Sequence, residues 1–101
     1  MLKIWGRISS INVRKVVWCA QELGLAFERV DAGRDFGIVQ TPTYRALNPN
    51  GLVPTIEDEL EGERVVLWES NVVVRYLCAR HASGTLYPEP LAARFDAERW
   101  M

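Results

Sequence analysis

The chain has 101 residues, of which 49% are hydrophobic and 25% are charged. This length suits one compact domain with its own core and leaves no room for a second. The 12 basic and 13 acidic residues are spread along the chain and give a net charge of -1, whereas a nucleic-acid-binding domain carries a basic stripe. The chain begins without the apolar segment of a signal peptide and has no run that could span a membrane, so we expect neither nucleic acid nor membrane as a partner.

The chain contains two cysteines, Cys19 and Cys78, and one histidine, His81. The cysteines lie far apart within helical patterns and form no Cys-X-X-Cys pair, so we expect apolar helix residues rather than redox or metal-binding groups. A single histidine cannot build a metal site. We therefore expect no metal, and thiols that suit the reducing cytoplasm.

The first thirty residues predict a strand, a helix and a second strand. Apolar and polar residues alternate over residues 2–5 and 27–31, which is typical of strands. The apolar residues between them recur at helical spacing: Val13, Val16, Val17, Ala20 and Leu23. Ser10 or Asn12 could cap this helix, and Gly24 would end it. A strand–helix–strand unit of this length forms a right-handed parallel crossover.

The next thirty residues predict a loop, a short helix and a hairpin. Residues 32–40 lose the pattern and, with two glycines and two charged residues, predict a mobile loop. A helix is expected over residues 41–47, with Thr41 as its cap and Pro42 in its first turn. Strands are then expected over residues 55–57 and 65–68, joined by an acidic turn.

A last helix is expected over residues 69–81. Its predicted buried face consists of Val72, Val73, Tyr76 and Leu77. The aromatic residues expected in the core or at an interface are Trp5, Trp18, Trp68 and Tyr76. The element order βαβαββα gives a four-stranded mixed sheet flanked by helices, which is an α/β fold of the thioredoxin-like type.

The last residues have a different composition. We expect residues 1–82 to form the thioredoxin-like domain and residues 83–91, which contain two prolines and a glycine, to be a linker. Residues 92–101 begin a helical pattern that has no end signal. We expect them to be the start of an all-helical second domain of a longer protein.

The stretch from residue 48 to residue 56 contains two prolines and a glycine, and predicts a loop that runs into a strand. Pro54 offers no N–H to a sheet, and an X–Pro bond is where cis peptides occur. A cis bond would turn the backbone of Val53 outward, where an extended peptide could pair with it. Glu69 and Ser70 then stand at a predicted helix N-terminus, which favours a carboxylate. Together these features predict a site for a small peptide.

These residues resemble the N-terminal domain of the cytosolic glutathione transferases, particularly bacterial members with an active-site serine. The matching segments follow one another with the family's order and spacing over nearly residues 1–88. They are residues 9–15, 22–28, 47–56 and 68–70. The segment from Leu91 is similar to the beginning of the family's helical second domain.

The resemblance implies roles for three residues at the predicted site. Val53, which precedes Pro54, would pair with the backbone of glutathione. Glu69 and Ser70 would hold the ammonium and carboxylate of the γ-glutamyl group, and the chemistry of a helix N-terminus agrees with this. The alternative is that Glu69 and Ser70 only cap the helix.

Ser10 lies where the family has its catalytic serine. Its hydroxyl would donate to the sulfur of glutathione and favour the thiolate, which is the nucleophilic form. Ser9 and Asn12 are rivals within reach of the same sulfur, and Ser10 could cap the helix as well. Arg14, one turn further on, could support Ser10 or could simply be an exposed arginine.

The family often holds the glycyl carboxylate of glutathione with a Lys, His or Gln, placed just before the pre-proline residue or at the tip of the second helix. This chain has Gly51 and Leu52 there instead. We expect Gln40 or Arg34 to supply the missing contact.

The resemblance implies a glutathione S-transferase that has glutathione as co-substrate and no permanently bound cofactor. Its reaction would be attack of the thiolate on a small hydrophobic electrophile, as in detoxification, and the full-length protein would be a cytoplasmic homodimer. Two alternatives stay open. One is a non-catalytic interaction module with the same fold, and the other is a glutathione-dependent isomerase of the maleylacetoacetate type.

Overall fold

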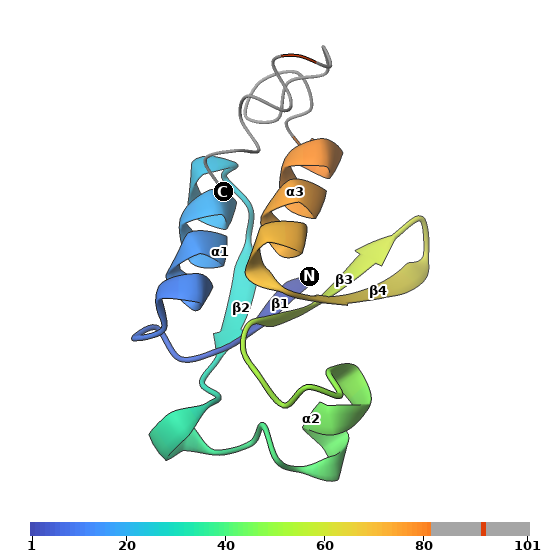
Figure 1. Cartoon of the computed structure of the whole chain (residues 1–101). Helices are drawn as coiled ribbons and strands as arrows, with labels where there is room; N and C mark the ends of the chain where they lie inside the picture. The colour runs from blue at the N-terminus through green and yellow to red at the C-terminus, as the bar shows by residue number, and fades with distance from the viewer. Residues whose placement is uncertain (82–91, 93–101) are drawn as a thin grey trace.

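The computed structural model, which describes residues 1–81 and residue 92, contains one four-stranded sheet (Figure 1). Its strands are β1 (Leu2–Trp5), β2 (Phe27–Val30), β3 (Thr55–Leu60) and β4 (Glu63–Trp68), in the order β2-β1-β3-β4. β1 is parallel to β2 and antiparallel to β3, and β3 is antiparallel to β4. The predicted thioredoxin-like fold with a mixed sheet is confirmed. The predicted linker over residues 83–91 and nearly all of the predicted helix over residues 92–101 lie outside the described residues.

Helix α1 (Ile11–Glu22) follows the predicted signals closely. Ser10 is its N-cap, and its hydroxyl oxygen accepts a hydrogen bond from the N–H of Val13 at 3.4 Å. After Glu22 the chain turns back at Gly24, whose φ of 67° lies in the left-handed region that glycine adopts without strain. The end of the helix is therefore set by the glycine, as the sequence indicates.

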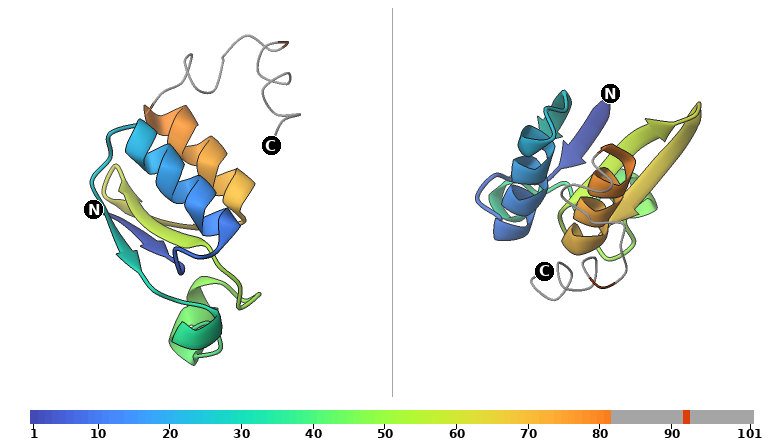
Figure 2. Two further views of the ribbon diagram at one scale, coloured as in Figure 1. Left: turned by 90° about the vertical axis from the view of Figure 1, so that its left-hand side faces the viewer. Right: turned by 90° about the horizontal axis from the view of Figure 1, so that it is seen from above.

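Helices α1 and α3 (Ser70–His81) lie side by side on one face of the sheet and cover its core (Figure 2). The buried core residues are Leu2, Ile4, Val13, Val16, Val17, Ala20, Ile56, Val73 and Leu77. Gly6 permits the tight turn from β1 into α1, because a Cβ there would lie 2.3 Å from a methyl carbon of Val13. The loop between β1 and α1 therefore packs closely against α1.

The buried face of α3 differs from the prediction. Its buried residues are Ser70, Val73, Leu77 and Cys78, whereas Val72 is 41% exposed and Tyr76 is only half-buried. The reason is that α3 packs against α1 as well as the sheet, which turns Cys78 toward Cys19, with 3.7 Å between the two sulfur atoms.

Two of the aromatic residues expected in the core or at an interface are exposed in this chain. Trp18 is 68% exposed on α1, where its indole N–H donates to Glu22 at 3.2 Å. Trp68, at the end of β4, is 40% exposed. An indole can lie on the surface when its N–H has a partner, as that of Trp18 does one helical turn away.

The hairpin between β3 and β4 is longer than predicted. The acidic residues expected to form a turn continue β3 as far as Leu60, and only Glu61 and Gly62 connect it to Glu63. Both connecting residues have positive φ (53° and 82°), as a two-residue type I′ turn requires. Acidic side chains of β3 find hydrogen-bond donors on other elements. Asp58, for example, accepts a hydrogen bond from the hydroxyl of Tyr76 in α3 at 2.9 Å.

Helix α2 (Pro42–Leu47) lies apart from α1 and α3, beyond the end of the sheet (Figure 1). Thr41 caps it, as predicted, by accepting from the N–H of Tyr44 at 3.3 Å. The ring of Tyr44 meets the ring of Trp5 edge-on at 5.8 Å, which attaches the helix to β1. The segment expected to be a patternless loop contains a 3₁₀ turn, η1 (Arg34–Phe36).

A cluster of polar side chains holds the loop between α2 and β3. The hydroxyl of Tyr44 donates to the carbonyl of Leu52 at 2.6 Å and lies 2.7 Å from the hydroxyl of Thr55. The side-chain amide of Asn48 donates to the same carbonyl at 3.1 Å and to Thr55 at 3.2 Å. Tyr44, Asn48 and Thr55 are all buried, so these bonds are shielded from water and fix the loop that leads into Val53.

We expect Tyr44→Phe to lower the free energy of unfolding by about 1–2 kcal/mol, because the carbonyl of Leu52 and the hydroxyl of Thr55 each lose a buried partner. Urea denaturation followed by circular dichroism measures this change. The control is Thr43→Ala at an exposed position of the same helix, which should change stability by less than about 0.5 kcal/mol. An unchanged urea midpoint for Tyr44→Phe would show that the cluster does not hold the loop.

Candidate functional site

The backbone of Val53 is the centre of the candidate site. The Val53–Pro54 peptide bond is cis, which is the condition under which the sequence analysis placed the backbone of Val53 at the site. Val53 is half-buried and immediately precedes the loop residue that leads into β3. Among the described residues, no hydrogen bond uses its N–H or its carbonyl. These two groups are therefore able to pair with an extended peptide that lies alongside.

Two pockets adjoin Val53, one on the side of α3 and one on the side of the first loop. The first, which we call the α3 pocket, has a volume of about 250 Å³ and is lined by residues that include Trp68, Glu69 and Ser70. The second, which we call the arginine pocket, has a volume of about 350 Å³ and is lined by residues that include Arg7, Ser10 and Arg34. Asn12, Leu52 and Val53 line both. The pockets thus form one groove along the Val53 backbone.

The start of α3 combines a helix cap with an unused hydroxyl. The Oε2 atom of Glu69 accepts a hydrogen bond from the N–H of Val72 at 3.0 Å, so Glu69 does cap the helix. Its Oε1 atom and the hydroxyl of the buried Ser70 make no hydrogen bond within the described part of the chain. Glu69 also has a φ of 74°, a conformation that costs a non-glycine residue free energy and that recurs at active sites and ligand-binding segments. Capping and ligand binding are therefore compatible here.

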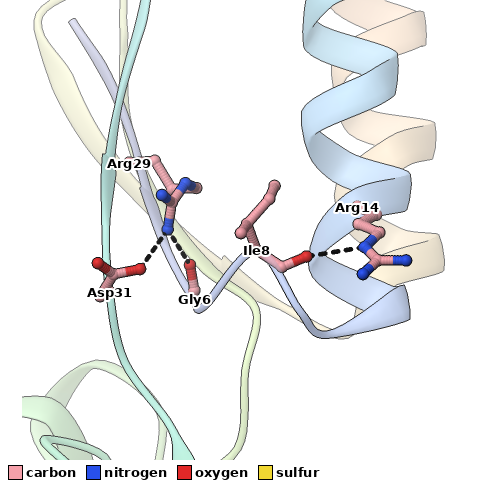
Figure 3. A network of polar contacts seen from close by, with 5 residues as sticks. All are labelled: Gly6, Ile8, Arg14, Arg29 and Asp31. Atoms are coloured by element: carbon pink, nitrogen blue, oxygen red, sulfur yellow. Dashed lines mark hydrogen bonds and ion pairs between the residues drawn. The ribbon is translucent and has the colours of Figure 1, made fainter. Parts of the chain in front are cut away.

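The loop before α1 is held in place by two arginines (Figure 3). Arg29, which is paired with Asp31, donates to the carbonyl of Gly6 at 3.1 Å. Arg14 donates through Nε to the carbonyl of Ile8 at 2.8 Å. Arg14 thus stabilises the loop that carries the candidate serines, and its side chain bonds to this backbone rather than to the hydroxyl of Ser10.

The three candidates for the thiol-activating residue are placed differently. Ser10 is buried and lines the arginine pocket; its oxygen accepts from Val13, which leaves its hydroxyl hydrogen free to donate. Asn12, in the first turn of α1, lines both pockets. Ser9 is exposed and is among the lining residues of neither pocket. The structure therefore brings Ser10 and Asn12 to the groove and leaves Ser9 outside it.

The two residues expected near the glycyl carboxylate are also separated. Arg34 lines the arginine pocket. Gln40 is exposed, lines neither pocket, and accepts a hydrogen bond through its amide oxygen from Arg45. A residue that the sequence reasoning missed is Arg7, which lines the arginine pocket beside Ser10. The sequence does contain a signal for Arg7, because this cation lies three residues before Ser10 in the same short loop.

The thiols of Cys19 and Cys78 face each other between α1 and α3 and are free. Burial, together with the neighbouring Cys78, raises the pKa of Cys19 from 9.0 to about 12. A thiol with this pKa is almost wholly protonated at neutral pH and is a poor nucleophile. Residues 1–81 contain no group of three His, Cys, Asp or Glu side chains that could hold a metal ion, and no helix there is long and apolar enough to cross a membrane.

Comparison with known proteins places the chain in a family. Residues 9–80 match the family model of the glutathione S-transferase N-terminal domain. Glutathione S-transferase GstB of Escherichia coli strain K12 is 46% identical over 101 residues, which cover 100% of this chain and 48% of that protein. Glutathione S-transferase 3 of Zea mays is 36% identical over 101 residues, 99% of this chain and 44% of that protein. The chain therefore belongs to the glutathione S-transferase family and corresponds to its N-terminal domain.

The solved structures agree with this assignment. The theta class glutathione S-transferase of Xanthomonas axonopodis pv. citri, determined with glutathione bound, superposes with a TM-score of 0.90 at 52% identity and covers 98% of this chain and 45% of its own. A glutathione transferase of Burkholderia graminis, determined with two glutathione molecules per subunit, superposes with a TM-score of 0.86 at 31% identity, covering 98% of this chain and 41% of its own. The chain thus spans less than half the length of these relatives.

We expect iodoacetamide at pH 8 to alkylate Cys19 in the folded protein roughly a thousandfold more slowly than in the unfolded protein, because a pKa raised from 9.0 to about 12 lowers the thiolate fraction by that factor. Mass spectrometry of tryptic peptides measures the rate at this residue. The control is the same protein in concentrated urea, where the thiol has its ordinary pKa. Equal rates in the two states would contradict a shielded thiol.

Proposed function

We propose that the chain is the glutathione-binding domain of a glutathione S-transferase. The observation that carries this proposal is the unpaired backbone of Val53, which lies between the α3 pocket and the arginine pocket. A tripeptide can pair with this backbone through its central residue and place one end in each pocket. The glutathione bound in the Xanthomonas structure, the relative with a TM-score of 0.90, supports the choice of ligand.

The α3 pocket receives the γ-glutamyl group in this proposal. The carboxylate of that group accepts hydrogen bonds from the hydroxyl of Ser70 and from N–H groups at the start of α3, where the helix dipole favours negative charge. The ammonium pairs with the Oε1 atom of Glu69, which is not used in capping. Both charges of the zwitterionic group thereby find a partner of opposite sign.

The sulfur of glutathione lies near the start of α1, where Ser10 activates it. The hydroxyl of Ser10 accepts from Val13 and donates its own hydrogen to the sulfur. A hydrogen bond to the ionised form lowers the pKa of the thiol, so more thiolate is present at neutral pH. The thiolate attacks a small hydrophobic electrophile, forms a carbon–sulfur bond, and the displaced group leaves with the electron pair. Asn12 is the alternative donor, since its amide lines the same pocket.

The remaining features are proposed by analogy with the family. We propose a cytoplasmic, homodimeric enzyme of detoxification, which uses glutathione as co-substrate and holds no permanent cofactor. The free thiols of Cys19 and Cys78 suit a reducing compartment. The relatives named glutathione S-transferase, at 46% and 36% identity, support the transferase over the isomerase and over a non-catalytic module.

We expect Ser70→Ala to weaken glutathione binding by about tenfold or more, because a hydrogen bond to a charged group contributes roughly 1.5–3 kcal/mol. Isothermal titration calorimetry measures the affinity. Asn71→Ala is the matched control, since Asn71 lies in the same helical turn and does not line the pocket. Absence of glutathione binding by the unmodified protein would overturn the proposed function.

We expect Ser10→Ala to raise the pKa of the bound thiol by about one pH unit while leaving the affinity for glutathione at acidic pH almost unchanged, since the hydroxyl stabilises only the thiolate. The ultraviolet absorbance of the thiolate, followed against pH in the complex, gives this pKa. Asn12→Ala is measured in parallel. A shift in Asn12→Ala and none in Ser10→Ala would assign the activation to Asn12.

A further inference from the structure

We propose that Arg7 binds the glycyl carboxylate of glutathione. This inference rests on the proposed function, and it assigns a contact for which Gly51 and Leu52 provide no side-chain partner. The carboxylate would be held from the loop between β1 and α1, and not from α2 or the residue before Val53.

Among the described residues, the guanidinium of Arg7 has no hydrogen-bond or ion-pair partner. Its Nε atom is buried and makes no hydrogen bond in the described structure. Its Nη1 atom would lie 2.7 Å from a Cβ on Gly33, and that same Cβ position is 3.6 Å from both methyl carbons of Val53. The group therefore sits against the backbone of Gly33, close to the side chain of Val53. No side chain in the described part of the protein pairs with this guanidinium, so its charge is available to an anionic ligand.

The two pockets carry opposite charges. The described residues that line the arginine pocket include Arg7 and Arg34 and no acidic residue. Those that line the α3 pocket include Glu69 and no basic residue. Glutathione has its ammonium at the γ-glutamyl end and an isolated carboxylate at the glycyl end. The groove therefore favours the orientation that places the glycyl carboxylate beside the arginines.

An extended tripeptide is long enough to reach both pockets from Val53. An extended tripeptide is roughly 10 Å long, so a ligand whose central residue pairs with Val53 places its ends in the pockets on either side. A guanidinium and a carboxylate match in a planar pair of parallel hydrogen bonds, which no other cationic side chain can form. Arg7 lines the pocket that receives the glycyl end, and its two outer nitrogens are the groups that would form this pair.

Arg7 is favoured over the other arginines nearby. Arg34 is exposed, so water screens its charge and it contributes less to binding. Arg45 is already engaged, because it donates to the carbonyl of Pro49 at 3.0 Å and to Gln40. Arg7 is half-buried, so its charge is less screened than that of Arg34. Unlike Arg45, its side chain forms no hydrogen bond with another described residue.

The position of Arg7 is also fixed before any ligand arrives. Its N–H donates to the carbonyl of Ala32 at 3.0 Å, and its carbonyl accepts from the N–H of Ser10 at 3.1 Å. Arg29 and Arg14 hold the residues on either side of it through the carbonyls of Gly6 and Ile8 (Figure 3). A cation on a preorganised loop loses little entropy on binding, which increases its contribution to affinity.

The test compares glutathione with its glycyl monoethyl ester, which lacks only the negative charge at that end, by calorimetric titration of the 101-residue chain. We expect the unmodified protein to prefer glutathione by about tenfold or more, as a charge-assisted pair implies. Arg7→Gln should abolish this preference and bind the ester as the unmodified protein does. Arg34→Gln is the matched control and should retain most of the preference.

Each outcome has one meaning. The assignment is overturned if Arg7→Gln keeps the full preference for glutathione over the ester. It is also overturned if Arg7→Gln loses affinity for both ligands equally, because an effect on the sulfur would produce that result. An unmodified protein that binds both ligands equally well overturns the role of Arg7 and leaves the proposed function standing, whereas failure to bind either overturns both. If Arg7→Gln does not fold by circular dichroism, Arg7→Lys replaces it and should show an intermediate preference.

Discussion

The buried hydrogen bonds among Tyr44, Asn48 and Thr55 are the constraint on which the candidate site depends. They tie α2 to the first residue of β3 and to the carbonyl of Leu52, so the chain between these points has little freedom. Burial raises the pKa of Tyr44, which keeps its phenol protonated and able to donate. Side chains of the loop and of α2 hold the loop, so no described residue needs to pair with the backbone of Val53 to keep it in position.

Around this loop, three segments that are distant in sequence meet at one end of the sheet. The loop after β1 contributes Arg7 and Ser10, the residues around Val53 contribute backbone, and the start of α3 contributes Glu69 and Ser70. The fold places the first and third of these together because α1 and α3 pack side by side on one face and both begin at that end (Figure 2). The site is thus a consequence of the sheet order, in which β1 and β3 are neighbours.

Much of this arrangement could be predicted from local signals. The caps at Ser10 and Thr41, the stop at Gly24 and the loop around Pro54 each act over a few residues, and the structure confirms the elements that they delimit. The less successful predictions concern contacts between elements. The extension of β3 to Leu60 depends on partners for its acidic residues in β4 and α3, and these partners are distant in sequence.

The sequence by itself determined the order of the elements, the resemblance to a family and the candidate residues, because capping, periodicity and proline chemistry are local properties. Only the tertiary structure decided which candidates share a groove: Ser10 and Asn12 line it, whereas Ser9 and Gln40 do not. It also placed Arg7 beside Gly33, a contact across 26 residues of chain that depends on the parallel pairing of β1 with β2. Which side chains are buried, hydrogen-bonded or close to a charge depends on segments that are distant in sequence and meet only when the chain packs. Local sequence patterns do not contain that information.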